Sequence, residues 1–200
     1  MTKRFRLAAG IAAALLPLPA LAAPESYTVD PIHTFPHFAI GHFGMSLIYG
    51  RFDKTSGRMT VDIAAKTGSV EITIEAASIN TADNERGGRP RSRDEHLRSP
   101  DFFNVQEFPR MTFKGSATRW NGDVPATLEG QLTLLGVTRP VTLTVDHWKC
   151  GPDPRTGGKG FMCGANASGT IKRSDFGMKT FIPAVSDEVR LMIQMEALRN

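Results

Sequence analysis

Apolar and polar side chains alternate with a period of two along most of the chain. The clearest case is Val70, Ile72 and Ile74, which alternate with Glu71 and Thr73. Alternation of this kind is typical of a strand with one buried and one solvated face. Further runs of the same type begin at Phe38, Met59, Met111, Leu128, Val141, Ala165 and Val189. Turn-forming pairs such as Ser56-Gly57 and Asn121-Gly122 separate several of these runs. The pattern predicts an all-β domain of about eight strands.

One stretch breaks the alternation. Residues 83–104 are too polar for a strand, and Ser92 to Leu97 could begin a short helix that Pro100 must end. No repeat or linker divides the remaining chain. We therefore expect one domain over residues 23–200, with a short helix in the 83–104 insertion.

Single-face alternation in every strand requires one shared interior, which either a sandwich or a closed barrel provides. Alternation alone leaves both open. The small side chains of Ala165, Ala167 and Gly169 would leave room for a ligand in a barrel, or would let two sheets approach closely in a sandwich. The apolar positions expected to face this interior are Phe38, Ile40, Val61, Ile72, Ile74, Leu132, Leu143, Ala167 and Ile193.

The first residues are typical of an export signal. Basic residues at positions 3, 4 and 6 precede an uncharged apolar segment, and Ala20-Leu21-Ala22 fits a cleavage site. The segment is too short to span a membrane. We expect residues 1–22 to be a signal peptide removed before Ala23, and the mature protein to be periplasmic.

Cleavage changes the charge. The whole chain has 24 basic and 20 acidic side chains, a net charge of +4. Three basic residues leave with the signal, so the mature balance is 21 minus 20, or +1. The insertion at 83–104 carries equal numbers of acidic and basic side chains and no aromatic residue among its arginines. Neither feature favours nucleic acid as a partner.

The chain has two cysteines, Cys150 and Cys163, with a turn-rich stretch of twelve residues between them. Two cysteines cannot form a cysteine-only zinc or iron–sulfur site. Because they lie on consecutive expected strands of an exported chain, we predict a disulfide bond between them, with two buried thiols as the alternative.

Sequence motifs for metal-dependent or nucleophilic catalysis are absent. His33, His37 and His42 are near in sequence, but His42 falls on the opposite face of a strand from the other two, so no metal site is predicted. Asp94, Glu95 and His96 are adjacent, and neighbouring residues on a helix do not face each other. We assign no catalytic residue and expect no cofactor.

The order of motifs resembles the YceI-like proteins. It starts with Tyr27-Thr28-Val29-Asp30 and His42-Phe43-Gly44, and continues with Arg93-Asp94-Glu95-His96-Leu97-Arg98-Ser99 and Phe108-Pro109-Arg110-Met111-Thr112-Phe113. Gly130 to Thr138, Arg173-Ser174-Asp175-Phe176-Gly177 and Val185 to Val189 complete the set. The resemblance covers almost all of the mature chain. It implies an eight-stranded antiparallel lipocalin-like β-barrel that binds a polyisoprenoid, such as an isoprenoid quinone or its precursor.

Three functions are weighed on this basis. The leading hypothesis is an exported protein that sequesters or carries a long isoprenoid lipid in the barrel, with His42 as a candidate for placing the headgroup. A carrier of this kind is compatible with transient contact with a membrane surface, and with a monomer or a homodimer. The second is an enzyme acting on a lipid-like substrate through His33, His96 or Asp94. The third is a stress-response structural protein with a filled interior and no ligand.

Overall fold

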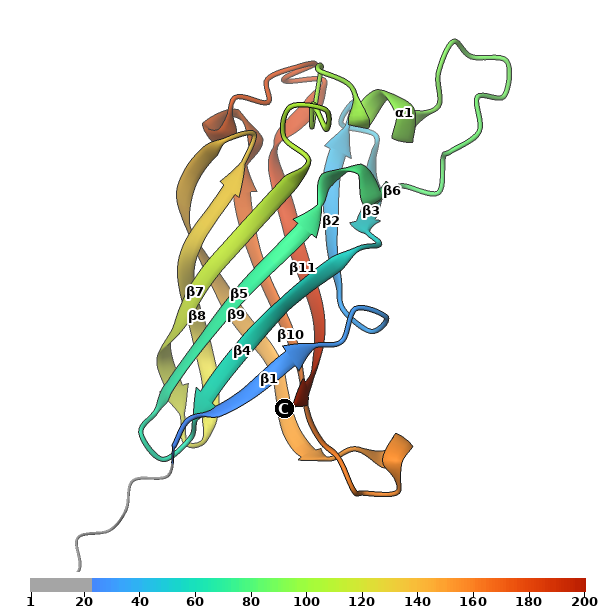
Figure 1. The fold of residues 1–200 in the computed structure, drawn as a ribbon. Coiled ribbons are helices and arrows are strands. Elements are labelled where there is room, and N and C mark those ends of the chain that lie inside the picture. The colour runs from blue at the N-terminus through green and yellow to red at the C-terminus, as the bar shows by residue number, and fades with distance from the viewer. Residues whose placement is uncertain (1–22) are drawn as a thin grey trace, which may run out of the picture.

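In a computed structural model of the chain, residues 23–200 are described, and they form a tall antiparallel barrel (Figure 1). The expected signal peptide, residues 1–22, lies outside the described residues. The eight strands of the closed ring are β1 (Glu25–Val29), β4 (Thr55–Asp62), β5 (Thr67–Glu75), β7 (Arg110–Asn121), β8 (Val124–Leu134), β9 (Val137–Pro152), β10 (Phe161–Lys172) and β11 (Val185–Arg199).

Pairing between the first and last strands closes the ring. Residues Tyr27, Thr28 and Val29 of β1 pair with Arg199, Leu198 and Ala197 of β11. The closure confirms the barrel and excludes the sandwich, because a sandwich leaves two sheets with free edges.

Three further strands continue the sheet from β11: β2 (Phe35–His42), β3 (Ser46–Phe52) and β6 (Ile79–Asn80). Strand β2 pairs with β11 from Val185 to Gln194, next to the segment of β11 that β1 occupies. Strand β3 pairs with β2, and β6 pairs with β3 through Arg51 and Phe52. At this end, which is the upper end in Figure 1, the described sheet stops at β6.

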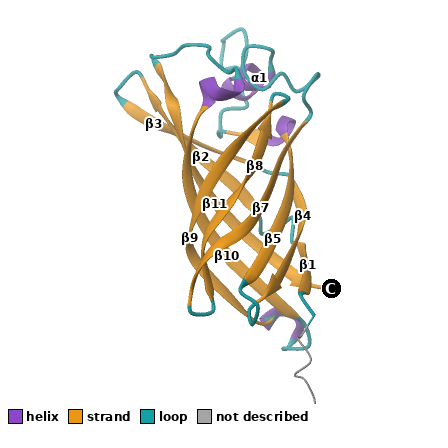
Figure 2. Ribbon diagram, turned by 90° about the vertical axis from the view of Figure 1, so that its left-hand side faces the viewer, coloured by secondary structure: helices purple, strands orange, loops and turns teal. Residues whose placement is uncertain are grey.

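The polar insertion connects β6 to β7. It contains the helix α1 (Arg93–Arg98), in agreement with the sequence-based prediction. Ser92 and Glu95 form a reciprocal capping box that satisfies the first free backbone N–H groups of the helix. Arg98 donates hydrogen bonds to the carbonyl oxygens of Ala77 and Ile79, so the helix is attached to the end of β6. Figure 2 shows α1 lying across the upper end of the barrel.

Three short 3-10 segments complete the structure, at Ala76–Ser78, Pro154–Thr156 and Arg173–Phe176. No helix among the described residues is long and apolar enough to cross a membrane. One strand end departs from the alternation that begins at Met59: Ile63 continues the spacing of Met59 and Val61, but it lies in the turn after β4 and is exposed.

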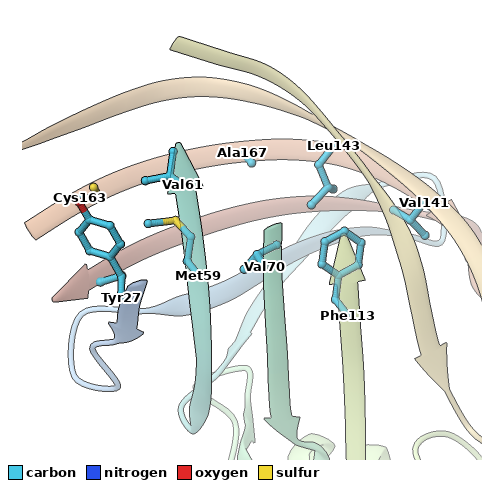
Figure 3. Packing of buried hydrophobic residues seen from close by; sticks show 10 residues of the cluster. Tyr27, Met59, Val61, Val70, Phe113, Val141, Leu143, Cys163 and Ala167 are labelled. Atoms are coloured by element: carbon cyan, nitrogen blue, oxygen red, sulfur yellow. The ribbon is translucent and has the colours of Figure 1, made fainter. Parts of the chain in front are cut away.

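The buried apolar side chains form two clusters. The lower cluster contains Tyr27, Met59, Val61, Val70, Phe113, Val141, Leu143, Cys163, Ala167 and Ala197. Figure 3 shows Tyr27 beside Cys163 at one end of this cluster and Phe113, Leu143 and Val141 at the other. The upper cluster contains Phe52, Ile74, Ala76, Ile79, Met111, Leu134 and Phe176. Both clusters surround spaces that are described below.

The predicted disulfide bond is present. Cys150 of β9 and Cys163 of β10 are direct cross-strand partners with Cα atoms 4.0 Å apart. The bond joins the bases of the β9–β10 hairpin at the lower end of the barrel (Figure 1). It therefore closes the loop that carries the short segment Pro154–Thr156.

Candidate ligand-binding site

The barrel contains an apolar cavity in its upper half, with a volume of about 320 Å³. Its walls come from the inward faces of β2, β3, β5 and β7 to β11. Residues of the insertion and of the 173–185 connection cover its upper end. The apolar side chains around this end are Leu97, Phe102, Phe103, Met178, Phe181 and Val185.

A second, smaller space of about 80 Å³ lies toward the lower end. Four side chains belong to the walls of both spaces: Ile72, Phe113, Leu143 and Ile193. They form a partition across the barrel. The interior therefore consists of an upper and a lower chamber rather than one uniform tunnel.

Glycines in the barrel wall position the largest side chain of this partition. A Cβ atom built on Gly115 of β7 would lie 2.8 Å from Cζ of Phe113, and one built on Gly130 of β8 would lie 2.6 Å from the same atom. The phenyl ring therefore covers two adjacent positions that carry no side chain. Any larger residue at either position would displace the ring from the partition.

All ten residues proposed from alternation and resemblance lie on the walls of these chambers. Eight of them line the upper chamber: Phe38, Ile40, His42, Ile72, Ile74, Leu132, Leu143 and Ile193. Of these, Ile72, Leu143 and Ile193 also line the lower one. The other two, Val61 and Ala167, line only the lower chamber. A single tunnel lined by the whole set would require the partition to move.

The polar residues of the upper chamber are cationic or neutral. They are His37, His42, Thr81, Arg93, His96 and Arg173. The described lining includes no carboxylate side chain. A ligand with a polar end would therefore meet hydrogen-bond donors rather than negative charge at this end of the cavity.

Arg173 is buried, with only 2% of its surface exposed. Its guanidinium donates to the carbonyl oxygens of Ser186 (2.8 Å), Val185 (2.9 Å) and Met178 (3.2 Å). Burial lowers the pKa of Arg173, and the charge of Asp187 opposes that shift. These bonds fix the β10–β11 connection over the chamber.

His96 of α1 contributes an aromatic ring at the upper opening. Its Nε2 lies 2.9 Å from Oδ2 of Asp101, and its ring packs edge-on against Phe102 and Phe181 at centroid distances of 5.0 and 5.9 Å. A hydrogen bond from Arg91, and a weaker contribution from the hydrogen bond of His96, lower the pKa of Asp101. The imidazole is therefore held in place between a carboxylate and two phenyl rings.

The two acidic neighbours of His96 have other contacts. Asp94 is buried and accepts hydrogen bonds from the N–H and hydroxyl of Thr81. Glu95 belongs to the capping box and also pairs with Arg86. The three residues thus face three different partners and do not form an acid–base set.

His33 takes part in a separate polar cluster between the β1–β2 turn and the lower hairpin. Among the described residues, the one group with spacing suitable for a metal ion is Asp30, His33 and Glu196. The guanidinium of Arg155 already lies among them, 3.1 Å from Oδ2 of Asp30 and 3.8 Å from Oε2 of Glu196. His37 and His42 do not belong to this group.

Sequence reasoning missed the residues that cover the chamber. Leu97 lies in the six-residue helix α1, and Phe102, Phe103 and Phe181 lie in irregular segments, so none of them follows a strand period that could assign it to an interior. The available signal was composition: three large apolar residues within a strongly charged insertion, and an apolar connection between the last two strands.

Comparison with known proteins agrees with this architecture. A family model described as the YceI-like domain matches residues 27–197. The protein YceI of an Escherichia coli strain is 38% identical over 182 residues, which cover 90% of each chain. The similarity therefore extends along nearly the whole of both proteins.

Two solved structures share the fold. The crystal structure of BcnA from Burkholderia cenocepacia has a TM-score of 0.62 and 24% identity, and the match covers 84% of this chain and 98% of that one. A polyisoprenoid binding domain from Saccharophagus degradans, implicated in plant cell wall breakdown, has a TM-score of 0.60 and 17% identity, with coverage of 88% and 99%. At these identities the likeness is one of fold.

Proposed function

Since the chain belongs to the YceI-like domain family, we propose that it is an exported protein that sequesters or carries a long-chain isoprenoid lipid in the upper chamber. The observation that carries the proposal is the chamber itself, a space of about 320 Å³ with almost entirely apolar walls. The Saccharophagus degradans domain with this fold, described as polyisoprenoid binding, supports the same ligand class.

The volume and lining suit an apolar chain. Ligand pockets in proteins span about 300 to 1,000 Å³, and a dry apolar cavity of about 150 Å³ already accommodates benzene. Each buried methylene contributes about 0.8 kcal/mol, so a few isoprene units give useful affinity without elaborate polar recognition. Ordering a flexible chain opposes part of this gain.

The polar residues at the upper end support an orientation. His42, Arg93 and His96 offer donors on the chamber wall next to the opening. A quinone or phenol headgroup carries oxygen acceptors, so it would lie at the opening with its chain directed toward Phe113. His42, whose ring packs on Phe43 at 4.1 Å, remains the candidate chosen from the sequence.

Binding is favoured over catalysis by the contacts of the candidate acid–base groups. Asp94 is buried under Thr81, and His33 lies in the polar cluster with Asp30 and Arg155 rather than on the chamber wall. Only His96 reaches the chamber. We therefore assign no reaction and no cofactor to the protein.

The disulfide bond supports export, because such bonds persist in oxidising compartments such as the periplasm. Export also requires the signal peptide expected over residues 1–22. Sequencing the N-terminus of periplasmic protein tests this part: a chain starting at Ala23 agrees with the proposal, and an intact Met1 on the exported protein contradicts it.

The ligand itself is tested by organic extraction of the purified protein followed by mass spectrometry. We expect an isoprenoid lipid in stoichiometric amount, and affinity for added isoprenoids that rises with chain length until the upper chamber is filled. Extracts free of lipid, together with affinities that do not depend on chain length, would instead indicate a filled interior without a ligand. Turnover assays on any lipid recovered address the enzymatic alternative.

A further inference from the structure

The upper end of the barrel exposes large apolar side chains on two neighbouring segments. Phe43, Met45 and Leu47 of the β2–β3 hairpin are 62%, 87% and 53% exposed, and Phe181 of the β10–β11 connection is 56% exposed. The segments touch, since the N–H of Phe43 donates to the carbonyl of Ala184. We call these four side chains the rim patch.

The rim patch is continuous with the cavity. Phe181 belongs both to the patch and to the chamber wall, and His42, next to Phe43, also lines the chamber. Figure 2 shows the β2–β3 hairpin projecting from the barrel at the end that carries α1. Apolar surface thus runs from the interior, over the rim, to the tip of a projecting hairpin.

Charge on these segments has one sign. Residues 43–50 contain no charged side chain, and residues 177–184 contain one, the exposed Lys179. The charged groups of the adjacent insertion are largely paired with one another, as in Arg86–Glu95, Arg89–Asp83 and Arg91–Asp101. The two segments that carry the rim patch therefore contain no carboxylate side chain and one cation, Lys179, that forms no ion pair with the described residues, which suits an anionic lipid surface.

We infer that the rim patch docks on a lipid bilayer and inserts Phe43, Met45, Leu47 and Phe181 among the headgroups, so that the chamber opens directly onto the membrane. The inference rests on the proposed function, because an isoprenoid in the chamber must be exchanged with another apolar phase. Shallow insertion of apolar side chains next to basic residues is the usual mode of reversible interfacial binding.

A membrane accounts for the patch better than a protein partner does. The exposed residues lie at a projecting tip and around an opening, where a bilayer can cover both at once. Other exposed apolar residues, such as Ile63 in the turn after β4 and Val124 at the start of β8, lie at the opposite end and do not line the chamber. A second copy of this chain on the free edge of β3 is the competing arrangement, and the experiment separates the two.

The test measures binding to vesicles of phosphatidylethanolamine and phosphatidylglycerol by flotation. The variants are Met45→Glu/Leu47→Glu at the tip and Lys179→Glu on the connection; the matched controls are Val124→Glu and Lys159→Glu at the lower end. The protein is expressed from the full-length gene, and mass spectrometry establishes that every variant has the same N-terminus. Circular dichroism checks the fold.

We expect the wild type to float and the tip variant to lose about tenfold or more in vesicle affinity, since burial of a large apolar side chain is worth that much or more. Lys179→Glu should weaken binding to vesicles that contain phosphatidylglycerol but not to neutral ones. Both controls should bind as the wild type does. A wild type that stays with the soluble fraction, or controls that lose as much as the tip variant, would overturn the inference.

Two further readouts separate this inference from the proposed function. Isoprenoid affinity in detergent solution should be the same in the tip variant and the wild type, because Met45 and Leu47 do not line the chamber, while extraction of isoprenoid from vesicles should slow. Vesicle binding without isoprenoid binding would leave the docking surface valid and contradict the proposed carrier. A wild type that is dimeric in light scattering and a tip variant that is monomeric would assign the patch to a second copy and overturn membrane docking.

Discussion

A Cβ atom on Gly130 would lie 2.6 Å from Cζ of Phe113, so the phenyl ring occupies the place that a side chain on Gly130 would need. The ring forms part of the partition between the upper and lower chambers. Under the proposed function, the length of apolar chain that the barrel accepts depends on this one aromatic residue and on Gly115 and Gly130 beneath its ring.

Replacing Phe113 should lengthen the preferred ligand. In Phe113→Leu we expect isoprenoid affinity to keep rising beyond the chain length at which the wild type levels off, because the smaller side chain opens a path to the lower chamber. Titration with an isoprenoid chain-length series measures this. Identical plateaus in the two proteins would mean that the ligand never reaches the partition. Phe113→Ala provides a stronger opening, although a buried Phe→Ala change costs about 3 to 5 kcal/mol of stability.

Gly130→Ala should destabilise the fold. Its new methyl group would also lie 2.5 Å from the backbone oxygen of Lys114, which cannot move without disturbing the ladder between β7 and β8. Overpacking of this kind costs about 1 to 3 kcal/mol. Gly164→Ala is the matched control, since a Cβ there meets nothing within 4 Å. Urea unfolding should show a lower midpoint for Gly130→Ala only; equal midpoints would contradict the close packing.

Filling the upper chamber should reduce ligand binding without unfolding the protein. Val189 lines the chamber, and its neighbour Arg190 on the same strand is exposed. A phenyl group at position 189 would displace roughly two or three methylenes of the ligand. Losing their burial costs about 1.5 to 2.5 kcal/mol of binding free energy, which lowers the affinity about tenfold or more. We expect this loss for Val189→Phe but not for Arg190→Phe, by titration with one isoprenoid. Equal affinities would place the ligand elsewhere.

Stability should fall in acid partly through Asp30. Burial would raise the pKa of Asp30, but hydrogen bonds from His33, from the N–H of Ile32 and from Arg155 lower it. Because the folded-state pKa lies below the unfolded value of about 3.9, this contribution is complete well above pH 4 and declines as the pH falls below it. Asp30→Asn should lose stability at pH 7 and show a smaller difference between pH 7 and pH 3. An unchanged pH dependence in thermal unfolding would contradict this role.

The disulfide bond should stabilise a fold that survives without it. In the chain-entropy model, closing a loop of this size contributes about 3 kcal/mol. The replacement Cys150→Ala/Cys163→Ala should therefore lower the urea midpoint, while the circular dichroism spectrum stays that of the barrel. Reduction of the wild type should shift its midpoint to that of the variant. A midpoint unaffected by reduction would show that the bond adds no stability.

The sequence predicted which strand residues face the interior, but not where along the barrel each of them lies. Alternation identified residues such as Ile72, Leu132 and Leu143 as inward-facing, because a strand with one buried side sends every second side chain to the same interior. Helix α1 was also predictable, since its capping residues and the following proline act within a few residues of each other. The disulfide bond followed from two cysteines on consecutive expected strands of a chain with an expected export signal.

The tertiary structure decided how that interior is divided and opened. Closure depends on Tyr27 pairing with Arg199, and the partition depends on Phe113 of β7 lying over Gly130 of β8. Such contacts join residues that are remote or on different strands, so no local period encodes them. Sequence alternation therefore grouped Ala167 with Phe38, while packing placed them in separate chambers. Phe102 and Phe181 cover the chamber because of where their irregular segments pack on the closed barrel. That position depends on the complete set of strand pairings.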